Sequence, residues 1–358
     1  MKQGRPVQRH KTDSAMKNTI PLTDSQWLIG QIREIHAAIR VAVVGACEDP
    51  DRGDLSQVVE DTTGDTIYAV DRISEELLVD LFEKKIAHKF SMVLIAEGLS
   101  GGKLILPRGT EETDAMLRVI ADPIDGTRCL MYQKRSAWIL TGVAPNYGEH
   151  TNLADIELAV QSEIPLVKQH LCDVLWATRS KGTDGERFNR ISGERRPLPS
   201  RPSRAGEPAH GFCSVARFFP GGKDVLAAID DEIMFGIEGV NRPGKAYAFE
   251  DQYLSTGGQL YELIVGHDRF IADIRPLLRP ILEKRGLVSG LCCHPYDVCT
   301  ELIAREAGVL ITNHMGQPLN VSLDLESDVS WIGYANGKIR KLIEPRVFAA
   351  LQDRGMVN

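Results

Sequence analysis

Two aspartates with a proline between them follow an apolar run in the segment ADPIDGT. Proline fixes its own φ angle and biases the residue before it toward an extended conformation, so we expect a strand to end at Asp122 and the chain to turn back with Asp125. Both carboxylates and the Ile124 carbonyl oxygen could then converge on one point. Gly126 and Thr127 would open the next helix, whose free N–H groups suit a phosphate group.

Oxygen ligands beside such a helix end describe a Mg²⁺ phosphate site, because Mg²⁺ binds proteins through a few carboxylates together with the phosphates of its substrate. The loop by itself is also compatible with a simple turn whose acids lie in water. Two further acids favour the metal site. Glu97 ends the apolar run SMVLIAEG, and Asp297 follows His294-Pro295-Tyr296 at the expected start of a helix.

The spacing of apolar residues predicts the elements that deliver these acids. Short runs rich in Val and Ile are predicted as strands, at 91–98, 116–123, within 136–178, at 308–312 and at 330–336. Helical spacing predicts helices at about 25–47, 71–86, 223–235, 256–265 and 297–307. A segment rich in Gly, Pro, Arg and Ser, 182–210, is expected to form an exposed hairpin and loop. Helices and strands alternate in the second half, which indicates an α/β arrangement there.

Composition narrows the classes of partner. The chain has 358 residues, a net charge of -7 and 43% hydrophobic residues, so it can bury a large core and would on average repel nucleic acid. No apolar run approaches the roughly 20 residues of a membrane span, so no membrane partner is expected. Seven cysteines without a CxxC pair fit a reducing compartment, and a cytoplasmic location is predicted.

Three motifs follow one another in a recognisable order: AEG, ADPIDGT and HPYDVCTELIAREAGVLI. Together they resemble the inositol monophosphatase family, a group of metal-dependent, lithium-sensitive phosphatases whose superfamily includes fructose-1,6-bisphosphatase. The intervening segments VDRISEELL and STGGQLYELIVGHDRF fit the same family, and the resemblance covers roughly residues 24–345. It implies an α/β fold, the αβαβα sandwich. We expect a flexible tail at 1–23, an α+β subdomain with the metal loop at 24–150, and an α/β subdomain at 151–358.

The resemblance also implies roles for the acids. Glu97, Asp122 and the Ile124 carbonyl would hold a first Mg²⁺ ion, and Asp122, Asp125 and Asp297 would hold a second, with two or three ions per site. Asp71 would orient the hydroxyl of Thr127, while Glu97 and Thr127 would position the attacking water and Gly126 with Thr127 would cradle the phosphate. A homodimer that acts on a small phosphorylated substrate, without a phosphoenzyme, is expected.

Departures from the family pattern bear on the substrate. Gly98 stands where many members carry a second Glu. The inositol-contacting Glu of the family falls near Ala272 and Asp273, so the resemblance implies that Asp273 contacts the substrate. Arg128 follows the DGT motif, and Lys134-Arg135 replaces a Phe-Pro pair, so these cations could favour a substrate with a second anionic group. The predicted function is Mg²⁺-dependent hydrolysis of a small phosphate monoester. A sugar bisphosphatase, a nucleotide 3'-phosphatase, and a metal-binding regulatory protein that lost turnover remain alternatives.

Overall fold

The computed structural model describes residues 19–49, 58–61, 66–99, 101–237, 246–288 and 290–357. Most of the tail expected at 1–23 lies outside these residues, and the first helix, α1 (Leu22–Glu48), begins two residues before that expected boundary. In the described ranges, no helix combines the length and the apolar character that a bilayer crossing requires.

The larger of the two main sheets has the strand order β10-β9-β8-β7-β6-β5-β3-β4. Its strands are β3 (Met92–Ala96), β4 (Lys103–Leu106), β5 (Leu117–Asp125), β6 (Ala137–Pro145), β7 (Leu158–Ile164), β8 (Leu171–Thr178), β9 (Thr183–Asn189) and β10 (Arg195–Pro197). Among these described strands, β3 and β5 form a parallel pair and the other pairs are antiparallel. The predicted strands at 91–98 and 116–123 and the sheet within 136–178 are confirmed, and β9 with β10 forms the expected hairpin in 182–210.

The smaller main sheet has the order β11-β12-β14-β13. Its strands are β11 (Phe212–Val215), β12 (Asp268–Asp273), β13 (Leu310–Thr312) and β14 (Trp331–Tyr334), which confirms the strands predicted at 308–312 and 330–336. A separate short hairpin joins β1 (Val58–Asp61) to β2 (Thr66–Tyr68) just before α2 (Ala69–Lys85). The larger sheet passes the expected boundary at residue 150, because β7 pairs directly with β6. The division into two subdomains stays a prediction.

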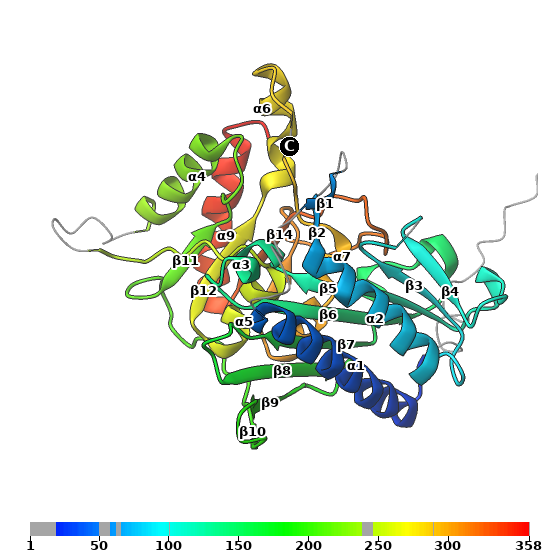
Figure 1. The fold of residues 1–358 in the computed structure, drawn as a ribbon. Helices are drawn as coiled ribbons and strands as arrows, with labels where there is room; N and C mark the ends of the chain where they lie inside the picture. Colours follow the sequence, from blue (N-terminus) through cyan, green and yellow to red (C-terminus); the bar gives the residue numbers. More distant parts are fainter. Residues whose placement is uncertain are drawn as a thin grey trace, which may run out of the picture.

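Three apolar cores separate the layers. Helices α1 and α2 pack on the outer face of the large sheet through Ile35, Leu78 and Leu94, among others. Helices α5 (Thr256–Val265), α7 (Pro295–Val298) and α8 (Glu301–Glu306) fill the space between the two sheets. Helices α4 (Lys223–Phe235) and α9 (Gly337–Gln352) cover the far face of the small sheet. The result is the predicted αβαβα sandwich (Figure 1).

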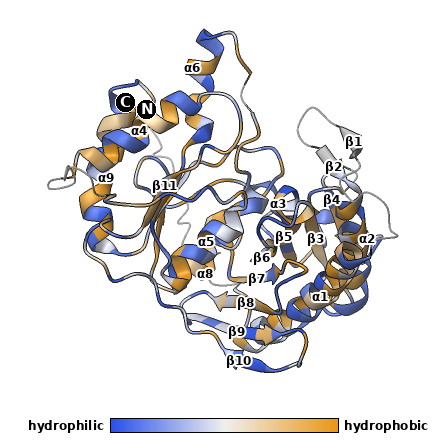
Figure 2. Cartoon of the chain, turned by 60° about the vertical axis from the view of Figure 1, so that its left-hand side comes forward, coloured by the Kyte–Doolittle hydropathy of each residue, from blue (hydrophilic) through white to orange (hydrophobic). Residues whose placement is uncertain are grey.

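Alternation along the strands assigns side chains to these cores. In β5, Val119 belongs to the core under α1 and α2, whereas Ile120 belongs to the core between the sheets. All nine residues of β5 are buried, because helices cover both faces of the sheet. The outer helices α1 and α2 carry both hydrophobic and hydrophilic residues, as expected for elements with one face in water (Figure 2).

One helix prediction needs correction. The helix expected at 297–307 is two short helices, α7 and α8, separated at Cys299 and Thr300. The hydroxyl of Thr300 donates a 3.0 Å hydrogen bond to the side-chain oxygen of Gln161 on β7. This contact ties the interruption to the large sheet, and it leaves Asp297 in the first turn of α7, at the edge of the layer between the sheets.

Candidate metal centre and active site

A bulge in β5 brings Asp122 and Asp125 to the same face of the large sheet. Asp122 pairs with Leu140 and Asp125 with Trp138, so three steps along β5 match two steps along β6. Residues three apart on a regular strand would point to opposite faces, and the extra residue in β5 cancels this difference. Leu140 and Trp138 both belong to the core between the sheets, so both aspartates face this layer. The predicted strand end at Asp122 is wrong, because the strand continues through the bulge to Asp125.

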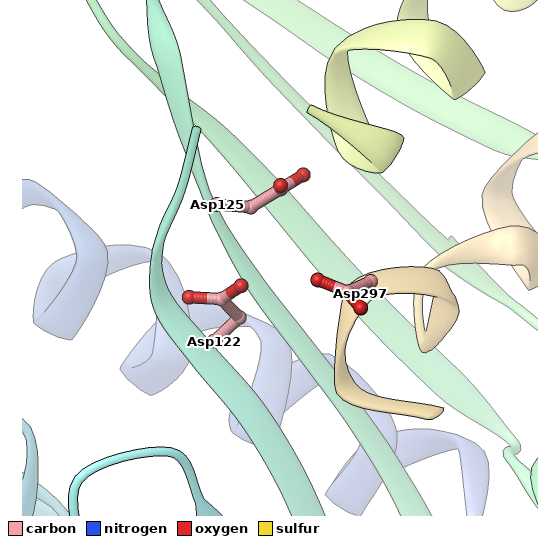
Figure 3. A group of neighbouring side chains, drawn as sticks. All are labelled: Asp122, Asp125 and Asp297. Carbon is pink, nitrogen blue, oxygen red and sulfur yellow. The ribbon is translucent and has the colours of Figure 1, made fainter. Parts of the chain in front are cut away.

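The third carboxylate comes from α7. One carboxylate oxygen from each of Asp122, Asp125 and Asp297 lies within 4.8 Å of the other two, and Figure 3 shows the three side chains gathered around a shared space. Asp297 Oδ2 accepts a 2.6 Å hydrogen bond from the backbone N–H of His294, which caps the start of α7 and orients the carboxylate. The structure thus brings together three acids that lie up to 175 residues apart in the sequence.

Hydrogen bonds hold the two loop carboxylates in place. Asp125 Oδ2 accepts a 2.8 Å bond from the hydroxyl of Ser255 and a 2.6 Å bond from the backbone N–H of Gly257, at the start of α5. Asp122 Oδ1 accepts a 2.9 Å bond from the backbone N–H of Ile124. The orientation of each carboxylate is therefore set by the fold before any ligand binds.

The electrostatics of this cluster are unfavourable without a cation. Burial raises the pKa of Asp125 to about 7. Burial, followed by the charges of Glu97, Asp125 and Asp297, raises the pKa of Asp122 well above its usual value. The pKa of Asp297 is raised by burial and then by Asp125. Ionised carboxylates repel one another in this buried cluster. Their oxygen atoms suit a hard divalent cation such as Mg²⁺, whose charge would offset that repulsion.

Thr127 and Asp71 meet beside this cluster. The Thr127 hydroxyl lies 2.9 Å from Asp71 Oδ1 and 2.9 Å from the Ile124 carbonyl oxygen. A hydroxyl has a single proton, so it can donate to only one of them at a time. Asp71 Oδ2 accepts a 2.9 Å bond from the backbone N–H of Tyr68, which fixes the carboxylate at the start of α2. If the Ile124 carbonyl binds a cation, the proton is directed to Asp71, as the family resemblance implies.

These groups line one cavity. Its described lining includes the acids Asp71, Glu75, Glu97, Asp122, Asp125 and Asp297, together with Gly126, Thr127, Arg128, Arg275, Phe218 and Phe219. Gly126 has a φ angle of 99°, a conformation that favours glycine, and the short helix α3 (Thr127–Met131) starts directly after it. Six carboxyl groups face two arginines in this described lining, a formal excess of four negative charges when all are ionised. A phosphate group would be repelled here unless cations are bound.

Asp273 is the one predicted site residue that the structure does not bring to this cavity. Its side chain is fully buried, and both carboxylate oxygens accept hydrogen bonds from Arg275, at 2.8 Å and 2.5 Å. The described lining of the cavity includes Arg275 and not Asp273, so the predicted contact of Asp273 with a substrate is not supported by its position. Arg135 is also turned away, since it pairs with Asp251 and Glu262. Neither it nor Lys134 belongs to the described lining.

Glu75 is a site residue that the sequence did not predict. Its carboxylate lies against Gly98, so that a Cβ atom added there would stand 1.9 Å from Glu75 Cδ. Glu75 follows Asp71 by one helical turn on α2, and this i, i+4 spacing was the signal that could have revealed it. At Gly98, where many members of the inositol monophosphatase family carry a second Glu, the space for that side chain is thus occupied by the carboxylate of Glu75 on α2. Arg275, Phe218 and Phe219 were missed as well, and no local pattern marks them.

The fold and the site together define a class of structure. Comparison with models of protein families finds no match, and comparison with curated protein sequences finds none either. Solved structures do match, and they show that the chain has the fold shared by fructose-1,6-bisphosphatase and inositol monophosphatase-like proteins. This confirms the fold that the three sequence motifs implied.

Three of the matching structures illustrate the likeness. The chain is similar to fructose-1,6-bisphosphatase of Leishmania major in its holo form, with 16% identity, a TM-score of 0.66, and coverage of 98% of this chain and 100% of that one. It is similar to extragenic suppressor protein SuhB of Bartonella henselae, with 14% identity and a TM-score of 0.60 over 89% and 98% of the two chains. It is also similar to a hypothetical protein of Pyrococcus horikoshii with similarities to inositol-1 monophosphatase. The identity is 16% and the TM-score 0.56, over 89% of this chain and 98% of that one.

Proposed function

We propose that the protein is a Mg²⁺-dependent phosphatase that hydrolyses a small phosphate monoester. The observation that carries this proposal is the convergence of Asp122, Asp125 and Asp297, each of which offers one carboxylate oxygen within 4.8 Å of the other two in a negatively charged cavity. The likeness to phosphatase structures supports the same function at the level of the fold. The expected homodimer and cytoplasmic location remain parts of this proposal.

The metal ligands are part of this proposal. Asp122, Asp125, Asp297, Glu97 and the Ile124 carbonyl would hold two or three Mg²⁺ ions. When bound, these ions supply the positive charge that a phosphate group needs in this cavity and lower the pKa of water. Because the carboxylates are already oriented by the protein, little rearrangement is needed on binding.

The remaining residues act on water and phosphate. Thr127 and Glu97 would position a water molecule for in-line attack on phosphorus, and Asp71 would accept the proton that passes through the Thr127 hydroxyl. A new O–P bond forms as the ester P–O bond breaks, and the departing oxygen takes a proton from solvent to leave as an alcohol. The backbone at Gly126 and Thr127 would hold the non-bridging phosphate oxygens. No side chain needs to become phosphorylated.

Phosphate release from a panel of sugar phosphates, inositol phosphates and nucleotides tests the proposal. We expect release with Mg²⁺ and none after chelation, with recovery when excess Mg²⁺ is returned. Lithium is expected to inhibit at high Mg²⁺, because a monovalent ion in the same place offers too little charge to stabilise the departing oxygen. Activity that survives chelation undiminished would refute the metal mechanism.

A further inference from the structure

A second cavity, of about 390 Å³, lies on the opposite side of the small sheet from the metal-binding acids. Its walls are the loop 313–317 after β13, strand β14 and helix α9, and its described lining shares no residue with that of the metal cavity. Along β14, Trp331 belongs to the core between the two sheets, whereas Tyr334 belongs to the core under α9. We propose that this cavity binds a free α-amino acid with a large apolar side chain, whose carboxylate contacts Arg340 and whose ammonium group contacts Glu344.

Arg340 and Glu344 form an ion pair that leaves one donor atom and one acceptor atom open. Arg340 Nε donates a 2.9 Å hydrogen bond to Glu344 Oε1, and Arg340 Nη2 donates a 3.1 Å bond to the Gly316 carbonyl oxygen. Within the described part of the chain, neither Arg340 Nη1 nor Glu344 Oε2 has a hydrogen bond. Both side chains are 32% exposed, so a ligand can reach them. An open donor beside an open acceptor suits a zwitterion, which carries a carboxylate and an ammonium group on one carbon atom.

A buried hydroxyl group lies near this pair. The side chain of Tyr334 is fully buried and lines the cavity, and its Oη atom has no hydrogen-bond partner among the residues that the structure describes. Burial raises the pKa of Tyr334, Glu344 raises it further and Arg340 lowers it, so the hydroxyl lies within the field of both charged groups. Buried polar groups without a partner are rare in folded proteins. The carboxylate of a bound amino acid would accept the hydrogen bond that Tyr334 lacks.

The wall that α9 contributes departs from the patterns that stabilise a helix. Arg340 lies in the first turn of α9, where the helix dipole disfavours a cation, and it precedes Glu344, which is the less favourable order for an i, i+4 ion pair. Pro345 lies inside the same helix and lacks the N–H group that would bond to the carbonyl of Lys341. Arg340, Glu344 and Pro345 all line the cavity. Several departures from local rules at one cavity are expected of a binding site.

Apolar side chains form much of the remaining wall and set the class of side chain that the ligand carries. Ile332 and Val347 are buried in this wall, and Phe348 and Met315 border the cavity. Met315 is 44% exposed, and a methionine side chain adapts to ligands of different shape. The loop beneath it is held by Asn313, whose Oδ1 atom accepts a 2.9 Å bond from the backbone N–H of Met315. The cavity volume falls within the range of small-molecule sites, so it can hold the side chain of phenylalanine, leucine or methionine.

Calorimetry with the whole chain tests the site, with L-phenylalanine, L-leucine and L-methionine as probes. We expect one molecule of L-phenylalanine to bind per chain. Phenethylamine lacks the carboxylate and phenylpropionate lacks the ammonium group, so each should bind at least tenfold more weakly, since hydrogen bonds to charged groups have effects of about that size. Saturating Mg²⁺ and inorganic phosphate should leave the affinity for L-phenylalanine unchanged, because the two cavities share no described lining residue.

Four variants assign the contacts. Tyr334→Phe removes only a hydroxyl group without a described partner, so it should be at least as stable as the parent in urea and bind L-phenylalanine about tenfold more weakly. Arg340→Met should bind L-phenylalanine and phenethylamine alike, because the carboxylate has lost its partner. Glu344→Gln should bind L-phenylalanine and phenylpropionate alike for the matching reason. Lys341→Met is the control and should bind like the parent, since Lys341 is exposed on α9 and absent from the described lining.

Several results would overturn the amino-acid site. The first is a parent protein that binds none of the three amino acids, and the second is equal affinity of the parent for L-phenylalanine, phenethylamine and phenylpropionate. Displacement of L-phenylalanine by phosphate would place the ligand in the metal cavity instead. Unchanged binding in Tyr334→Phe would refute the contact with the buried hydroxyl and with it the proposed geometry. Phosphate release enters none of these measurements, so the site and the phosphatase function stand or fall separately.

Discussion

Replacing Asp125 by asparagine should stabilise the metal-free protein while weakening its response to Mg²⁺. Asp125 is buried, and its Oδ2 atom accepts hydrogen bonds from Ser255 and Gly257. The oxygen of an asparagine can accept both bonds, so Asp125→Asn removes a buried charge and little else. A buried carboxylate destabilises the folded protein unless a cation offsets its charge, so its removal should stabilise the metal-free protein.

The size of the effect follows from the raised pKa. The pKa of Asp125 rises from 3.8 in the unfolded chain to about 7 in the folded protein, so the folded state binds the proton more tightly. The contribution of Asp125 to the free energy of unfolding therefore falls by about 1.4 kcal/mol per pH unit between pH 4 and pH 7, and the loss is complete above pH 7. Relative to the parent, the free energy of unfolding of Asp125→Asn should be higher by about 2 kcal/mol at pH 5 and by about 4 kcal/mol at pH 8.

Urea unfolding in the presence of EDTA at pH 5 and pH 8 measures this gain, with Asp231→Asn as the control because Asp231 is exposed on α4. Addition of Mg²⁺ at pH 8 should then stabilise the parent and stabilise Asp125→Asn much less. A gain that is the same at both pH values would show that the charge of Asp125 is not the cause. An equal effect of Mg²⁺ on both proteins would show that Asp125 is not a ligand.

Three further predictions concern single residues. In calorimetric titrations with Mg²⁺, Asp297→Asn should keep one bound ion and Asp122→Asn none, because Asp122 bridges both predicted sites; equal residual binding in the two variants would exclude the bridge. Glu75→Gln should weaken Mg²⁺ binding by roughly three- to tenfold, since a charge in the cavity lining is lost. The control is Glu76→Gln, exposed on the same helix, which should bind Mg²⁺ like the parent. Equal Mg²⁺ affinities of the two variants would show that Glu75 does not act in the site. Burial, with a smaller effect of Arg40, lowers the pKa of His36 from 6.5 to about 3, so the contribution of His36 to the free energy of unfolding should fall by about 1.4 kcal/mol per pH unit as pH drops below 6.5. The variant His36→Gln should lack this slope when urea unfolding is compared between pH 4.5 and 7, and parallel slopes in the two proteins would refute the assignment.

Local sequence determined much of the fold and the core of the candidate site. The helices predicted at 223–235 and 256–265 have the bounds that the structure gives them, because one apolar face and clear end signals define each. The segment ADPIDGT indicated that Asp122 and Asp125 lie close together, although a bulge within β5, and not a turn after Asp122, brings them to the same face. The sequence also predicted Glu97 at the end of a strand and Asp297 at the start of a helix, because both boundaries are visible in the local pattern.

Tertiary structure alone decided which other side chains reach the cavity. No residue near Gly98 in the sequence indicates that the carboxylate of Glu75 lies against it, since that contact depends on how α2 packs on the large sheet. The sequence singled out Arg135 and not Arg275 for an anion. In the structure Arg135 pairs with Asp251 and Glu262, whereas Arg275 pairs with Asp273 and lines the cavity. Local patterns report the conformation of a short stretch of chain. The partner that an ionic side chain finds depends on the close packing of layers distant in sequence, where burial makes an unpaired charge too costly to keep.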